Sequence, residues 1–338
     1  MSRISKNSWI GLGTFAVFCA LIPLVLADQY YMNIAVLTMI TIGLCVSWNI
    51  VGGISGLFSF AHTIFIALGA LMPALLAIHH GVNPWLSLTG AAAVSAIFAV
   101  GFAWLGTNFR LNVLTFALVT LGFSELTLLI VTSSRTLGGT TGISILTPLS
   151  IGGVSFNDPT RAFVLVAALV VLTILLTMVV LASKFGFYLV AQRDNESAAR
   201  GLGIPVLKYR SYAMVTSAVL TTMYGGLYAQ YVGYVDPYRV ASPLFIIEIV
   251  LFTTLGGLGT VWGPVLGAAL FMPMGELLRA QTGTSIPGVH EILVGFAVIL
   301  IVSFARTGLV GIIRSWELQT TIGSRFSRDS VEENSGKG

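Results

Sequence analysis

The stretch KFGFYLVAQRDNESAARGLGIPVLKYR, residues 184–210, is the one long polar interruption in an otherwise strongly apolar chain. Charged residues make up 9% of the protein, yet seven of them lie in this stretch. Hydrophobic residues make up 56% of the chain and its mean hydropathy is +0.92. A soluble domain carries about a quarter charged residues. This contrast predicts a polytopic membrane protein with one prominent polar loop.

Apolar runs of about 20 residues favour α-helices over barrel strands, which alternate over ~10 residues. We therefore predict an all-α fold with about ten transmembrane helices, packed closely through the chain's many glycines. Residues 1–27 resemble a signal peptide, but we expect them to be a retained first span. The segment 243–258 is short, and we expect it to be re-entrant or broken. The predicted spans are 8–27, 31–51, 61–79, 84–106, 112–133, 161–183, 211–233, 243–258, 261–279 and 287–306.

The distribution of basic residues orients these spans, because Lys and Arg accumulate in cytoplasmic loops. With a cytoplasmic N-terminus, thirteen of the seventeen Lys and Arg residues lie inside. The asymmetry predicts that both termini and the loop 184–210 are cytoplasmic. We expect residues 1–315 to form a single transmembrane domain. Residues 316–338 are polar, and we expect a short disordered tail.

Start and stop signals predict a short helix inside the polar loop. Asp194 or Asn195 can cap its N-terminus, because a short side-chain oxygen can accept from the free backbone N–H groups that follow. Gly201 and Gly203 can end the helix, and Pro205 prevents its continuation. About two turns of helix remain between these signals.

This short helix would present Ala198, Ala199 and Leu202 within a charged rim, with Glu196 suited to the positive end of the helix dipole. Such a shape suits docking into a groove on a partner. The alternative is an ordinary solvated loop, and the periodicity leaves both interpretations open.

Motifs of common enzymes are missing from the sequence. There is no G-x-x-x-x-G-K-[ST] loop, so the chain cannot bind ATP in that way, and there is no G-x-S-x-G elbow. Cys19 and Cys45 fall in apolar runs without metal-ligand spacing, so neither a disulfide nor a metal is expected. The sequence lacks the alternating series of acids and bases within the membrane that a proton relay would need. We expect no catalytic residues, no cofactor bound by this chain, and a pore-forming subunit powered from outside.

Two carboxylates, Glu125 and Glu248, lie inside predicted spans. A charge at that depth costs roughly 2.5–3.5 kcal/mol on insertion scales, so it usually faces a cavity or a partner. Either residue could line a path for a polar solute, or it could form a hydrogen-bonded strut between helices. The sequence leaves these two roles open.

Two glycine-rich segments echo one another before predicted spans. The first, GGISGLFSFAH, is flanked by Asn49 and contains Ser59 and His62. The second, GGLGTVWGPVLGAAL, begins at Gly256 and Gly257. Internal repeats in transporters often carry broken helices at the substrate path, so these residues are candidates for lining it. For His62, a satisfied packing role is the favoured interpretation over ligand binding.

Several segments in order resemble the permease subunits of branched-chain amino acid ABC transporters, of the LivM type. The similarity runs from about residue 30 to 315. One departure is Ala61, where the family usually has glycine. The segments are GLFSFAHTIFIALGA (56–70), LGGTTGI (137–143), AQRDNESAARGLGIPVLKYR (191–210), SAVLTTMYGGLYAQYVGYVDP (217–237) and IEIVLFTTLGGLGTVWGPVLGAAL (247–270).

The resemblance implies a multi-pass protein of the inner membrane with several partners. These are a second, LivH-like permease, two cytoplasmic ATPases that bind ATP and Mg²⁺, and a periplasmic or lipid-anchored solute-binding protein. The solute implied is a branched-chain amino acid, although related permeases carry urea or short amides. A stand-alone channel, an ion-coupled carrier and a structural scaffold are the rival classes. The resemblance gives the ATPase-coupling role to Arg193, Asp194, Glu196, Ala198, Ala199 and Gly203.

Overall fold

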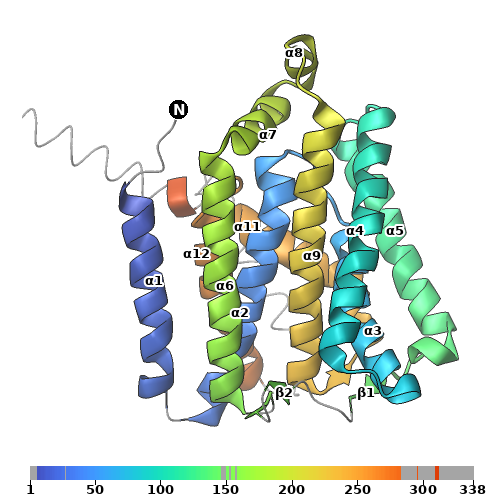
Figure 1. Ribbon diagram of the computed structural model, residues 1–338. Helices are drawn as coiled ribbons and strands as arrows, with labels where there is room; N and C mark the ends of the chain where they lie inside the picture. The colour runs from blue at the N-terminus through green and yellow to red at the C-terminus, as the bar shows by residue number, and fades with distance from the viewer. Residues whose placement is uncertain are drawn as a thin grey trace, which may run out of the picture.

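The computed structural model describes residues 6–26, 28–145, 150–151, 154–156, 158–282, 295 and 309–311. It is a helical bundle with two short strand pairs (Figure 1), which confirms the predicted all-α class. The elements are α1 (Lys6–Val25), α2 (Gln29–Asn49), the π-helix η1 (Ile50–Ile54), α3 (His62–His80), α4 (Pro84–Asn108), α5 (Val113–Ser133), the 3₁₀-helix η2 (Arg135–Leu137), β1 (Ile143–Ser144), β2 (Ser150–Ile151), β3 (Val154–Ser155), α6 (Pro159–Ala182), α7 (Lys184–Asp194), α8 (Glu196–Gly201), α9 (Val206–Val232), β4 (Tyr234–Val235), α10 (Pro237–Val240), α11 (Pro243–Gly257) and α12 (Gly263–Thr282).

Six helices in the described part of the chain are long and apolar enough to cross a membrane, and they overlap the first six predicted spans. They are Ser8–Val25, Gln29–Ile54, His62–His80, Pro84–Asn108, Val113–Ser133 and Pro159–Ala182. The predicted seventh span corresponds to α9, which lies alongside α2, α4 and α6 (Figure 1). Apart from Gly295, the predicted tenth span lies outside the described residues, as does the tail 316–338.

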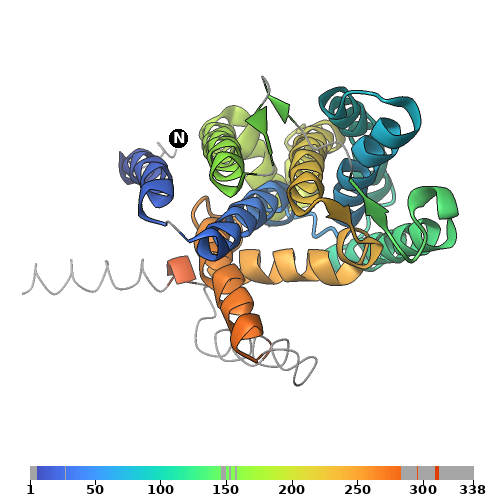
Figure 2. The same cartoon turned by 90° about the horizontal axis from the view of Figure 1, so that it is seen from below.

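The short predicted span 243–258 corresponds to α11, which has 15 residues. At 1.5 Å per residue α11 is about 22 Å long, less than the ~30 Å thickness of a hydrocarbon core. In Figure 2, α11 is seen from its side, whereas α6 and α9 are seen nearly end-on. Helix α11 therefore runs across the bundle and is not a regular full span.

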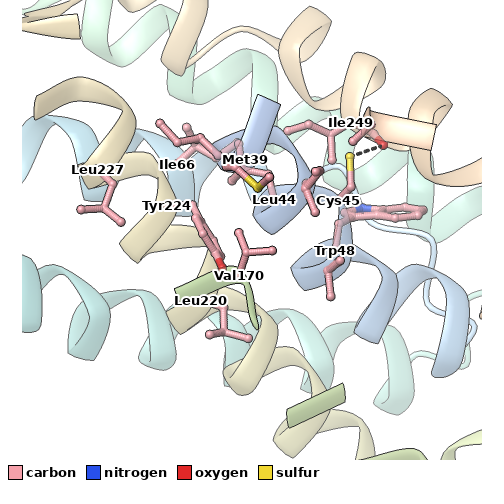
Figure 3. Packing of buried hydrophobic residues seen from close by; sticks show 14 of the residues in the cluster. Met39, Leu44, Cys45, Trp48, Ile66, Val170, Leu220, Tyr224, Leu227 and Ile249 are labelled. Atoms are coloured by element: carbon pink, nitrogen blue, oxygen red, sulfur yellow. Dashed lines mark hydrogen bonds between the residues drawn. The ribbon is translucent and has the colours of Figure 1, made fainter. Parts of the chain in front are cut away.

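Helix α2 is the centre of the bundle. In the most apolar 18-residue stretch of α2 and η1, 89% of the residues are buried. In the corresponding stretch of α1, only 6% are buried. An α-helix that is apolar on all sides suits such a surrounded position. Figure 3 shows Met39, Leu44, Cys45 and Trp48 of α2 among side chains from α3, α6, α9 and α11. The Cys45 thiol donates to the carbonyl oxygen of Ile249 at 3.5 Å.

Glycines allow the helices to approach closely, as predicted. A Cβ atom at Gly43 would overlap the ring of Tyr224, and one at Gly69 would overlap the carbonyl oxygen of Thr222. At Gly225 the added atom would lie 2.6 Å from a carbonyl oxygen of α3. These contacts bring the backbones of α3 and α9 together, since small residues let membrane helices pack at short range.

Two-residue strands tie loops together at the end of the bundle opposite α8 (Figure 1). Strand β1 pairs antiparallel with β4, with Ile143 opposite Val235, and β2 pairs with β3. The loop after α5 and the turn after α9 are thus held side by side. Two residues are too few to show the alternation that predicts a strand.

Candidate functional site

The polar loop forms α7 and α8 at one end of the bundle (Figure 1). The cap of α8 is Asn195, whose Oδ1 accepts from the backbone N–H of Ala198 at 2.9 Å. Asp194 instead ends α7 and accepts from Arg193 Nε at 3.1 Å. Helix α8 ends at Gly201, and Gly203 has a φ of +79°, in the left-handed region that suits glycine. The predicted short helix is confirmed, with Asn195 as its cap.

Charged side chains fasten α8 to the bundle. Both Arg200 Nη2 and Arg210 Nη1 lie 2.7 Å from the carboxylate of Glu196. Arg200 also donates to the backbone oxygen of Thr107, at the end of α4, at 3.2 Å. Partial burial alone would raise the pKa of Glu196, but the hydrogen bonds and charges of the two arginines outweigh burial and lower that pKa. The short helix is therefore anchored to both α4 and α9.

The two faces of α8 differ sharply in exposure. Leu202 is 82% exposed, and Ala198 is also exposed. Ala199 is 2% exposed, so the prediction that it belongs to the presented surface is wrong. The reason is helical spacing: Ala199 lies three residues after Glu196, on the face that the arginines hold against the bundle, whereas Ala198 and Leu202 are four residues apart on the opposite face.

Arg193 connects α7 to the first glycine segment. Its Nη1 donates to the backbone oxygen of Gly53 at 3.0 Å. Gly53 lies in the π-helix η1, and π-helical turns occur frequently at functional sites. Gly56 has a φ of +74°, and a Cβ atom there would lie 2.6 Å from Arg193 Cγ. The Arg193 side chain therefore packs directly on the irregular end of α2.

Asn49 joins the first glycine segment to the second. Its Nδ2 donates to the backbone oxygen of Thr260 at 2.8 Å, and its Oδ1 accepts from the backbone N–H of Gly259 at 2.9 Å. Asn49 is 1% exposed, so both ends of its amide are satisfied inside the protein. Gly53 lies against Gly259, where an added Cβ atom would be 2.5 Å from the backbone nitrogen. The two segments form one contact, to which Arg193 is attached.

Gly256 and Gly257 shape the connection between α11 and α12. A Cβ atom at Gly256 would overlap the carbonyl oxygen of Gly263 and lie 2.9 Å from the nitrogen of Gly267. Gly257 has a φ of +136°, a conformation that L side chains rarely adopt. Both glycines are thus required by local packing, and their role in lining a path stays a prediction.

Ser59 and His62 lie in buried packing beside the first segment. Trp48 Nε1 donates to the backbone oxygen of Ser59 at 2.7 Å, and His62 Nε2 lies 2.8 Å from Ser217 Oγ. Because the Ser217 hydroxyl donates to the backbone oxygen of Ser47, its oxygen accepts from His62, which places a proton on Nε2. The geometry places His62 in buried packing, but its Nδ1 has no hydrogen-bond partner among the described residues, so the predicted satisfied role holds for Nε2 alone. Ala61 beside it is fully buried.

The two membrane carboxylates lie in different surroundings. Glu248, on α11, forms an ion pair with Arg239 of α10 at 3.1 Å, and the Arg239 guanidinium lies 4.3 Å from the ring centre of Phe245. This is the strut that the sequence offered as one alternative. Glu125 is exposed on α5, on the same stripe as Leu118 and Leu129. The solute-path role of both carboxylates stays a prediction.

Comparison with known proteins identifies the family of the chain. Residues 30–303 match the family described as the permease component of the branched-chain amino acid transport system. The chain belongs to this permease family. It is 31% identical over 275 residues to the high-affinity branched-chain amino acid transport system permease protein LivM of Salmonella typhimurium, and equally to that of Escherichia coli K12. The match covers 73% of this chain and 63% of each relative, and no solved structure matches the chain.

Family membership and the six apolar helices establish a multi-pass membrane protein. The relatives are named as permeases, which fits the expectation of a non-catalytic membrane subunit. Sequence reasoning about this permease nevertheless missed how α8 is anchored. The Glu196–Arg200 pair could have been found, because the two residues are four apart on one helix. The Arg210 pair and the Arg193–Gly53 bond join separate elements, and no local spacing indicates them.

Proposed function

We propose that the chain is the transmembrane subunit of an ABC importer for branched-chain amino acids or a similar small polar solute. Its partners would be a second, LivH-like permease, two cytoplasmic ATPases and a periplasmic or lipid-anchored solute-binding protein. The ATPases would bind ATP and Mg²⁺. The family match and the names of the curated relatives support this proposal.

The same proposal includes the topology of the chain in the inner membrane. A cytoplasmic N-terminus followed by the six spans before α7 would place α8 in the cytoplasm, and the basic residues support that orientation as well as a cytoplasmic C-terminus. The β1–β4 pair would then lie outside. The exposed Ala198 and Leu202 would meet an ATPase, together with the rim formed by Arg193, Asp194 and Asn195.

The observation that carries the proposal is the continuous contact from α7 to both glycine segments. Arg193 bonds to Gly53, and Asn49 bonds to Gly259 and Thr260. ATP-driven closure of the ATPase dimer would move α7 and α8, and this contact would carry the movement to η1 and to the connection between α11 and α12. The spans would then shift between outward-open and inward-open states.

Replacing Leu202 by glutamate tests the docking role. Leu202 is 82% exposed, so the change should leave the bundle intact while placing a charge in a desolvated interface. We expect ATPase binding and ATP-driven uptake to fall by about tenfold or more. The matched control is Val232→Glu, at the far end of α9. Equal ATPase binding by the wild-type and Leu202→Glu proteins would refute docking through this face.

Uptake measured with the purified chain alone separates an importer subunit from a channel or carrier. We expect no solute flux in vesicles that lack the ATPases. Flux through the chain alone would overturn the proposal. Uptake of urea but not leucine by the full assembly would assign the chain to the urea and amide transporters.

A further inference from the structure

A cavity of about 380 Å³ lies between α10, α11 and α12. Helix α10 directly follows β4, and β4 pairs with β1 at the end of the bundle opposite α8 (Figure 1). The cavity thus begins near that end of the bundle and extends along α11 as far as Phe252. Its volume falls within the range of about 300–1,000 Å³ that is usual for small-molecule sites.

The charged residues that the structure describes in the cavity wall carry both signs in equal number. Arg239 pairs with Glu248 at 3.1 Å, and Arg279 pairs with Glu276 at 3.6 Å. A neutral set of this kind does not favour a ligand with net charge. It does favour a ligand that carries one positive and one negative group at a short separation, because each group can meet an opposite charge.

The first of these pairs keeps the capacity to bind a ligand. The side chains of Arg239 and Glu248 are 31% and 29% exposed, so both can be reached. Arg239 also forms a hydrogen bond with Tyr228, but a guanidinium has five N–H donors and a carboxylate has two acceptor oxygens, so these bonds do not saturate either group. The Arg239–Glu248 strut therefore also forms part of the cavity wall.

The rest of the wall is apolar and includes Leu251, Phe252 and Phe271. Phe252 and Phe271 are almost fully buried, so they form a fixed surface against which an aliphatic side chain can pack. Gly275 also lines the cavity, and a Cβ atom at this position would meet no atom within 4 Å. The glycine thus leaves room that any larger residue would fill.

We propose that this cavity is a binding site for a zwitterionic amino acid with an aliphatic side chain. The carboxylate of the ligand would face Arg239 and Arg279, and its ammonium group would face Glu248 and Glu276. Its side chain would lie on the aromatic rings. This site rests on the proposed function and refines it, because urea and short amides lack the two charges that the wall matches.

Binding of radiolabelled leucine to the full chain in lipid nanodiscs tests the site without the ATPases. We expect leucine to bind and competitors that lack one feature to be at least about tenfold weaker. The competitors are 4-methylpentanoate without the ammonium group, 3-methylbutylamine without the carboxylate, glycine without the side chain, and urea. Equal competition by 4-methylpentanoate and leucine, or no leucine binding, would overturn the proposal.

Gly275→Leu fills the cavity while leaving both ion pairs in place. Because leucine favours helix more than glycine does and the added atom meets open space, the variant should fold and lose leucine binding by about tenfold or more. Gly101→Leu, at an open position on α4, is the matched control and should bind normally. Glu248→Gln gives an independent test, with thermal unfolding as the check on folding.

ATP-driven leucine uptake by the complete importer separates failure of this site from failure of the proposed function. If Gly275→Leu leaves the half-saturating leucine concentration unchanged, the site is refuted and the importer assignment stands. If the wild-type assembly takes up no leucine although the chain binds it, the site stands and the proposed function fails.

Discussion

Replacing Asn49 by leucine removes the link between the two glycine segments at nearly constant side-chain size. The amide makes two hydrogen bonds, to Gly259 N–H and to the Thr260 carbonyl oxygen, and Asn49 is 1% exposed. An orphaned buried backbone group costs about 1–3 kcal/mol, so two groups that relax in part give about 2–4 kcal/mol. The loss falls on the connection between α11 and α12.

Hydrogen exchange over residues 257–262, followed by mass spectrometry, measures this loss of local stability directly. Since about 1.4 kcal/mol corresponds to a factor of ten, exchange there should be faster by roughly 30- to 700-fold. ATPase binding should be retained, because the exposed face of α8 is unchanged, while ATP hydrolysis should no longer drive uptake.

Asn83→Leu is the matched control for this experiment. Asn83 caps α4 by accepting from the backbone N–H of Trp85 at 2.9 Å, so its loss should cost about 1 kcal/mol and leave coupling intact. If Asn49→Leu exchanges over 257–262 like the wild type and still couples hydrolysis to uptake, the reasoning about this contact fails.

Two further predictions concern packing and pH. Gly69→Ala should lower the stability of the bundle by about 1–3 kcal/mol, because the added Cβ atom overlaps a backbone oxygen of α9, and Gly101→Ala should be neutral in the same thermal unfolding assay. The lowered pKa of Glu196 means that its stabilisation of α8 is fully present above the ordinary carboxyl pKa of about 4.3 and is lost as the pH falls through the lowered pKa. A spin label at Ser197 should therefore stay ordered from neutral pH to about pH 5 and become mobile in stronger acid, and Glu196→Gln should remove this pH dependence.

Local chemistry made parts of the permease predictable from its sequence. The polar loop carries a capping residue, Asn195, and a terminating glycine, Gly203, so its short helix could be placed to within about two residues. Long apolar runs located the first six spans in the same way. These features depend on neighbours within a few positions along the chain.

The parts that sequence reasoning missed depend on tertiary packing. Which side of α8 faces the bundle is decided by Arg210 on the next helix, and that arrangement buries Ala199. The partners of Asn49 are more than 200 residues away in the chain. The course of α11 across the bundle also depends on the helices that surround it, because composition fixes the length of an apolar helix but not its tilt.

Helix α9 gives the molecule a mechanical property that its separate contacts do not reveal. It runs for 27 residues without proline, about 40 Å of continuous helix, from the Arg210 anchor of α8 to the turn that begins at Gly233. A tilt imposed at the α8 end would be carried along this helix to its other end, where β4 leads into α10 and the cavity. Helix α9 thus joins the helix that we propose to dock on the ATPase to the segment that leads to the cavity.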